Sequence, residues 1–291
     1  MPRVYFDNTF YNFLDKGWFA PQDVEEFKIL SGRKIRSYFS PVNADELLAQ
    51  WPTDHVAALR MLGIARDLVG FDNVLKQPAD LLRDEIVAYA QGLASPPKTM
   101  PRSLATFFDR ELREVAEGGP GSDQLAAKVA ADITTLKDDY KKQMADARDE
   151  VLTHMKWNER TPAERKSVPF DEYLAESGPY LAEAFADSVG VGDACRRRGI
   201  TGLLKRRVVA ICVGSQMSWI YSLTVPWAGG IETRETDRSD GYDNWHALEA
   251  SAADIFVTGD TGLAKNLKRL KIADFTVVTS LRELLDKVQS R

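Results

Sequence analysis

The sequence predicts an α/β protein in which a parallel sheet lies between layers of helices and the chain is interrupted by an all-helical insertion. Short apolar runs that lead into helix-like segments occur near both ends of the chain, at 4–49 and 242–288. Between them, apolar residues recur with helical spacing and no strand pattern appears. Alternation of strand and helix at both ends, around a helical middle, is typical of one parallel-sheet domain that carries a helical insertion or cap.

Near the N-terminus, each predicted strand leads into a helix through a polar corner. The run Val4–Phe6 favours β structure and ends at Asp7-Asn8-Thr9, after which Phe10 begins helical spacing. Pro21 is tolerated in the first turn of a second helix. The predicted elements are a strand at 4–6, helices at 10–16 and 21–31, a strand at 35–39 and a helix at 44–49.

The middle of the chain is predicted to be helical throughout. The helical stretches are 51–94, 107–115, 124–157, 171–189 and 201–222. Pro-rich and Gly-rich punctuation at 95–122 marks loops or a hinge, and the stretch at 201–222 is apolar enough to be well buried.

Strand signals return in the C-terminal part. The predicted elements are a helix at 242–253, a strand at 255–258, a helix at 263–270, a strand at 275–278 and a helix at 281–288. The resulting division is a discontinuous α/β domain at 1–75 and 235–291, with 76–234 as a helical insertion or cap.

The composition is that of an ordinary soluble globular protein, with 44% hydrophobic and 28% charged residues. A net charge of −5 argues against a protein that coats nucleic acid through its overall field, although a local basic groove remains open. Cys195 and Cys212 lack metal-ligand or disulfide-scaffold spacing and indicate packing residues in a reducing compartment. No signal peptide or membrane-spanning run is predicted, so we expect a cytoplasmic protein without a membrane partner.

Acidic residues follow two of the predicted strands. Asp7 ends the first strand, and Asp260 lies in the turn after the strand at 255–258. Ligands of open parallel sheets bind beyond the carboxyl ends of the strands, so both acids are candidates for one site. Each also has a simpler role, because an aspartate at this position often only caps the next helix, with a contribution of about 1 kcal/mol. Asp243 has the same alternative, and Glu46 could merely complement a helix dipole.

Three segments, VYFDNTF at 4–10, FSPVNADELL at 39–48 and DNWHALEASAADIFVTGD at 243–260, together resemble the PIN-domain nucleases. The resemblance covers about 1–60 and 240–291. It implies a compact PIN-like parallel sheet with helices on both sides and an acidic pocket that binds Mg²⁺ or Mn²⁺ for RNA hydrolysis. The four acids of the family fall on Asp7, Glu46, Asp243 and Asp260. The supporting hydroxyl and amide positions fall on Thr258, Asn8 and Thr9.

The chain departs from a minimal PIN domain in two ways. The stretch between the second and third acids is far longer, and the segment from Asp243 to the strand at 255–258 is slightly short. Asp237, Asp240 and Asp254 therefore compete with Asp243 for the third acidic role. We favour the interpretation that Asp237 and Asp240 are solvated loop charges and that Asp254 is a residue at the entry of a strand.

The residue types suit a hard cation. Clustered carboxylates repel one another unless a cation neutralises them, and oxygen ligands suit Mg²⁺ or Mn²⁺. No Cys/His cluster indicates zinc, and no covalent nucleophile is apparent. Arg197 and Arg206, within the basic runs 196–198 and 205–207, and Lys265 near Asp260 are candidates for holding the RNA backbone. The alternative for these basic residues is a solvated helix face.

The sequence thus predicts a metal-dependent endoribonuclease acting on single-stranded or structured RNA. One alternative is a non-catalytic PIN-like scaffold whose helical insertion binds a protein partner. Another is the toxin component of a toxin–antitoxin pair. The sequence leaves open whether the protein forms a homodimer or binds a protein partner through the insertion.

Overall fold

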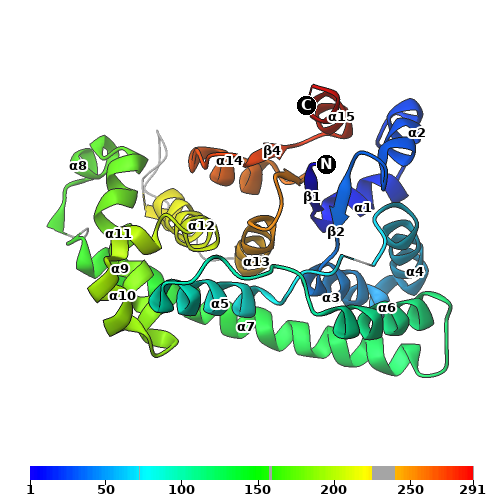
Figure 1. Ribbon diagram of the computed structural model, residues 1–291, viewed down its shortest axis with the longest axis horizontal. Coiled ribbons are helices and arrows are strands. Elements are labelled where there is room, and N and C mark those ends of the chain that lie inside the picture. Colours follow the sequence, from blue (N-terminus) through cyan, green and yellow to red (C-terminus); the bar gives the residue numbers. More distant parts are fainter. Residues whose placement is uncertain (72, 157–158, 225–239, 291) are drawn as a thin grey trace.

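The computed structural model describes residues 1–71, 73–156, 159–224 and 240–290 (Figure 1). The elements are β1 (Arg3–Phe6), α1 (Asn8–Asp15), α2 (Pro21–Leu30), β2 (Arg36–Tyr38), α3 (Pro41–Ala49), α4 (Trp51–Leu68), α5 (Pro78–Gln91), α6 (Arg102–Ala116), α7 (Ser122–His154), α8 (Pro162–Ser167), α9 (Phe170–Ser188), α10 (Gly192–Arg198), α11 (Ile200–Leu203), α12 (Arg207–Thr224), α13 (Asp240–Ala250), β3 (Ile255–Val257), α14 (Thr261–Arg269), β4 (Thr276–Val278) and α15 (Leu281–Gln289). No helix in the described stretches has the length and apolar character needed to cross a membrane.

The four strands form one parallel sheet in the order β2-β1-β3-β4. Strand β1, from the start of the chain, pairs with β3 from its end, and the register places Tyr5 opposite Phe256. The predicted parallel α/β sheet built from both ends of the chain is therefore confirmed. Because all strands run the same way, the segments that follow them lie at one edge of the sheet.

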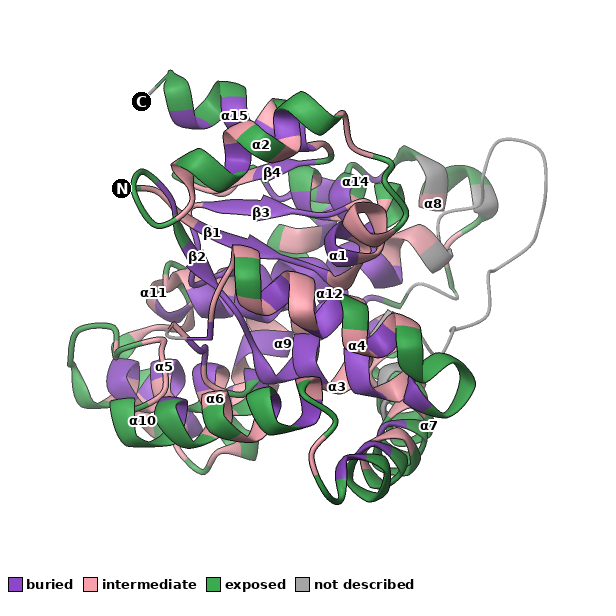
Figure 2. Ribbon diagram, turned by 90° about the vertical axis from the view of Figure 1, so that its right-hand side faces the viewer, coloured by how far each residue is buried: buried purple, intermediate pink, exposed green. Residues whose placement is uncertain are grey.

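Each face of the sheet is covered by helices, and Figure 2 shows the strands as a buried layer. Side chains alternate across a strand, so Val4 and Phe6 point to one face of β1 and Tyr5 to the other. Val4 and Phe6 join a hydrophobic cluster with side chains of α1, α2, α4 and α15. Tyr5 joins a second cluster with side chains of α9, α12, α13 and α14. Both faces are thus buried, which explains why the strands read as uninterrupted apolar runs.

The helical middle of the chain is part of the core. One continuous cluster contains Tyr5, Phe256 and Val277 of the sheet together with buried side chains of α9 and α12. Both of these helices lie inside the predicted insertion 76–234. The predicted boundaries at 75 and 235 therefore do not coincide with a boundary in the packing, because the apolar run within α12 completes the core.

Two predicted helical stretches differ in detail from the structure. The stretch 51–94 is two helices, α4 and α5, separated where Gly70 adopts a φ of +74° and Val74 bridges to Phe39. The stretch 201–222 begins later, at Arg207, and is preceded by the short helices α10 and α11. The two cysteines are buried and free, as expected of packing residues.

Candidate functional site

The carboxyl ends of β1 and β3 carry the first group of predicted residues. Asp7 follows β1 and is almost fully buried, at 2% exposure. Its carboxylate accepts hydrogen bonds from the hydroxyl of Thr9 (2.5 Å) and the backbone N–H of Phe10 (3.3 Å). The hydroxyl of Thr258, from the end of β3, donates to its other oxygen. Asp7 is therefore both the N-cap of α1 and a link to the C-terminal part of the chain.

Thr258 connects Asp7 to Asp260. The hydroxyl that donates to Asp7 also accepts the backbone N–H of Asp260, at 2.9 Å. The Asp260 carboxylate is half-buried and caps α14 by accepting the N–H of Leu263, at 2.8 Å. Capping thus applies to both Asp7 and Asp260. Both residues lie at the same edge of the sheet because they follow β1 and β3, which run parallel.

Glu46 reaches this edge from α3. One of its oxygens, Oε2, accepts from Nδ2 of Asn8 (2.6 Å) and contacts Nε2 of His246 (3.0 Å). Asn8 is in turn held by Asn43, whose Nδ2 donates to Oδ1 of Asn8 at 3.2 Å. We call the group of side chains that meet here the acidic edge: Asp7, Asn8, Glu46, His246, Thr258 and Asp260.

A buried network lies behind the acidic edge. The hydroxyl of Tyr5 donates to Oε2 of Glu249 (2.6 Å), and Nδ1 of His246 lies 2.6 Å from the same hydroxyl. Since Tyr5 has one proton to donate, Nδ1–H of His246 donates to the Tyr5 oxygen. All three residues are at most 4% exposed. Within the described ranges, Oε1 of Glu249 has no hydrogen-bond partner.

The electrostatics of the site are those of buried acids around one imidazolium. Burial opposes the charge of His246, but Glu46, Glu249 and Asp7 raise its pKa to about 9. Burial likewise opposes the charge of Glu46, yet His246 and Asn8 hold the pKa of Glu46 below its usual value. Burial raises the pKa of Asp7, and burial with the nearby charges of Glu46 and Asp132 raises that of Asp45 to about 7.

The candidates for the third acidic role separate by position. Asp243 lies on α13, three residues before His246, and is half-buried. Asp240 begins the same helix, and its side chain lies outside the described part, as does all of Asp237. Asp254 lies at the amino end of β3, where its carboxylate pairs with Arg3 at 2.5 Å. Asp254 is thus the strand-entry residue that we favoured, on the side of the sheet opposite the acidic edge.

The predicted basic contacts are corrected in part. Arg206 is used inside the fold, where Nη1 contacts Glu85 (3.3 Å) and Nη2 donates to the carbonyl of Leu93 (2.5 Å). The adjacent Arg207 donates to the carbonyl of Ala253, just before β3. Arg206 therefore does not face the acidic edge, because it anchors the start of α12 near the amino ends of the strands. Arg197 is exposed on α10, and Lys265 is exposed on α14, the helix that Asp260 caps.

Tyr5, Glu249 and His246 are not among the site residues that the sequence predicted. Glu249 lies three residues after His246 and therefore on the same face of α13, which is the signal that could have paired them. Lys137 of α7 was also missed. Its charge is near enough to Glu46 to contribute to the low pKa of that carboxyl, after the larger effects of burial and His246.

The donor set of the acidic edge fits Mg²⁺ or Mn²⁺, which prefer carboxylate oxygens. Among the described residues, Oε1 of Glu46 and Oδ2 of Asp260 accept no hydrogen bond and keep open lone pairs. Within the described ranges, no group of three or more acidic, histidine or cysteine side chains is arranged closely enough to hold a metal ion. Binding of a shared ion would therefore require rotation of side chains.

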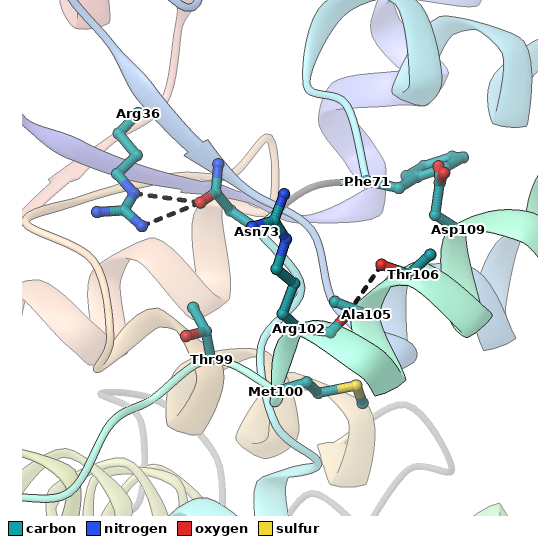
Figure 3. Close-up of a pocket in the computed structure, with 9 residues that line it drawn as sticks. All are labelled: Arg36, Phe71, Asn73, Thr99, Met100, Arg102, Ala105, Thr106 and Asp109. Carbon is teal, nitrogen blue, oxygen red and sulfur yellow. Dashed lines mark hydrogen bonds between the residues drawn. The ribbon is translucent and has the colours of Figure 1, made fainter.

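A groove of about 640 Å³ lies elsewhere, along the edge strand β2 (Figure 3). It is lined by Arg36, Phe71, Asn73, Thr99, Met100, Arg102, Ala105, Thr106 and Asp109. Nε and Nη2 of Arg36 donate to the amide oxygen of Asn73, at 3.2 and 3.0 Å. Arg36 pairs in register with Arg3 at the amino ends of the strands, so this groove is separate from the acidic edge.

Comparison of the chain with family models, with curated proteins and with solved structures gave no significant match.

Proposed function

We propose that the acidic edge is the catalytic site of a Mg²⁺- or Mn²⁺-dependent endoribonuclease that cleaves single-stranded or structured RNA. The observation that carries the proposal is the meeting of sequence-distant acids at one edge of a parallel sheet. Thr258 links Asp7 to Asp260 across more than 250 residues of chain, and Asn8 links the same corner to Glu46. The proposal includes a PIN-like identity of the fold, which rests on the three segments that resemble that family.

The chain's own residues orient the acids before substrate binds. Thr9 and Thr258 hold Asp7, while Asn8 and His246 hold Glu46. Such supporting contacts fix the direction of the carboxylates that bind a cation. Asp7, Glu46, Asp243 and Asp260 are the residues that would hold the ion. A bound ion would supply a water of lowered pKa and neutralise charge on the phosphate.

The test replaces Asp7 or Asp260 by asparagine. Asparagine caps helices as well as aspartate does, so Asp7→Asn and Asp260→Asn retain the caps of α1 and α14 while removing a charge. We expect Mn²⁺-stimulated cleavage of a labelled RNA to fall by about 100-fold or more in each variant, with an unchanged circular dichroism spectrum. Full activity in both variants would refute the proposal.

A matched control separates capping from chemistry. Ser280 caps α15 by accepting the N–H of Glu283 at 3.1 Å, and it is not one of the residues of the acidic edge. Ser280→Ala removes a cap and costs about 1 kcal/mol of stability. We expect it to lower the thermal midpoint without changing the cleavage rate.

The second candidate function is a non-catalytic scaffold. It is favoured by the extent to which the acids are satisfied within the protein, since both oxygens of Asp7 accept hydrogen bonds and Glu46 is paired with His246. A scaffold would show no Mn²⁺ binding in calorimetry and no RNA cleavage. It would instead bind a protein partner through the helical part of the chain.

A further inference from the structure

The long helix α7 passes beside the acidic edge. It packs against α3, which carries Glu46, and against α13, which carries Asp243 and His246 (Figure 1). A small hydrophobic cluster of Val42, Ile133 and Tyr242 joins the three helices. This places a helix from the middle of the chain against the two helices that supply part of the acidic edge.

One lysine of α7 lies over this junction. Lys137 follows Ile133 by four residues and therefore shares its face of the helix. Its Nζ lies 4.5 Å from the centre of the Tyr242 ring, and Tyr242 directly precedes Asp243. The side chain of Lys137 is half-buried, so its ammonium is held at the rim of the acidic edge.

The ammonium of Lys137 is near enough to Glu46 to lower the pKa of that carboxyl, but it is not held in a direct ion pair by a described residue. The contact with the Tyr242 ring positions the charge without cancelling it. Among the described residues of the acidic edge, the second cation is His246, which is buried and bonded to Glu46 and Tyr5. Lys137 is therefore the more accessible of the two cations, and an ammonium is a point charge that suits a phosphate oxygen.

We propose that Lys137 binds a backbone phosphate of the RNA strand beside the acidic edge, so that α7 forms one wall of the substrate-binding site. This inference rests on the proposed function, since it assigns the substrate contact of the same site. It gives the helical middle of the chain a direct part in binding. The positive charge of Lys137 would offset the repulsion between a backbone phosphate and the buried acids.

The structure offers a matched control on the same helix. Lys128 is exposed and lies nine residues before Lys137, about two and a half turns, which places it on the opposite side of α7. Lys128→Gln removes the same charge at an exposed position on the other side of the helix. Lys137→Arg keeps the charge and serves as a rescue variant.

The experiment measures binding of a fluorescein-labelled oligouridylate by anisotropy in EDTA, where no cleavage takes place. We expect Lys137→Gln to weaken binding about five-fold and to reduce the slope of log Kd against log salt by about 0.7. Lys128→Gln should stay within about two-fold of wild type, and Lys137→Arg should restore most of the affinity. Thermal melts of all variants check that the fold is retained.

The outcomes separate this inference from the proposed function. One outcome is that the wild type binds the RNA but does not cleave it with Mn²⁺, while Lys137→Gln binds it more weakly. This outcome supports the Lys137 contact and refutes the nuclease. A wild-type protein that cleaves RNA, while Lys137→Gln binds with the same Kd and salt slope, overturns the contact alone. Absence of RNA binding by the wild type also overturns it.

Discussion

Glu249 shows how one buried residue can control stability. Its side chain is fully buried, and one of its oxygens has no hydrogen-bond partner in the described residues. Burial raises the pKa of Glu249 to about 7, although the charge of His246 and the hydroxyl of Tyr5 favour the ionised form. A carboxyl whose pKa is higher in the folded state than in the unfolded state stabilises the fold when it is protonated. That stabilisation is complete below pH 4 and is lost as the pH rises to about 7.

We therefore predict that Glu249→Gln flattens the pH dependence of stability. Between pH 5 and pH 8, the free energy of unfolding of the metal-free wild type should fall by about 3 kcal/mol more than that of the variant. Urea denaturation at the two pH values measures the difference. An identical fall in both proteins would show that Glu249 does not titrate in this range. His246 adds a fall in both, because its pKa is raised to about 9 and its contribution is lost as the pH passes that value.

The sequence predicts the acids at the strand ends but not the residues behind them. Asp7 and Asp260 stand at polar corners after apolar runs, and such corners are visible in one dimension. Glu249 is not visible in this way, because a glutamate in a helix is normally exposed and its burial depends on which elements cover α13. Arg206 was misplaced for the same reason, since its partner Glu85 lies on another helix.

At the scale of elements, a buried ion cluster joins α5 to the start of α12. Glu85 of α5 is 1% exposed and accepts from Lys98 and from the hydroxyl of Ser95 (2.7 Å). Arg206 completes the cluster. Removing one partner of a buried pair leaves the other charges uncompensated.

We predict that Glu85→Ala lowers the free energy of unfolding by about 3 kcal/mol. The neighbouring Asp84 pairs with Lys76 at 2.8 Å in a more exposed position, so Asp84→Ala should cost less than about 1 kcal/mol. Chemical denaturation of both variants tests the contrast. Equal losses of unfolding free energy in the two variants would contradict the prediction that the buried Glu85 cluster stabilises the fold more than the Asp84–Lys76 pair.

The elements that sequence patterns missed are the short ones. Helices α10 and α11 span seven and four residues, too few to repeat an apolar period. The break between α4 and α5 was also missed, because helical spacing resumes directly after Gly70. Long periodic helices such as α7 and α9 were predicted nearly to their ends.

At the scale of the whole molecule, the helical middle is expected to be required for folding. Helices α9 and α12 complete the cluster that covers the Tyr5 face of the sheet. Replacing 76–234 by a flexible linker should therefore give a protein without a cooperative thermal transition in calorimetry, since its remaining apolar face stays in water. A soluble, cooperatively folding product would instead establish the separate domain at 1–75 and 235–291.

Strand order was beyond the sequence. Alternating strands and helices predict a parallel sheet. Every strand is a short buried apolar run, however, so no local sequence pattern indicates that β1 lies between β2 and β3. The helical middle hides the relation further, because it separates the two pairs of strands along the chain.

The pairing of β1 with β3 has a consequence for how the protein is made. A ribosome synthesises Asp7 long before Thr258, and the hydrogen bond between them needs both. The acidic edge therefore stays incomplete until the C-terminal part of the polypeptide has been translated.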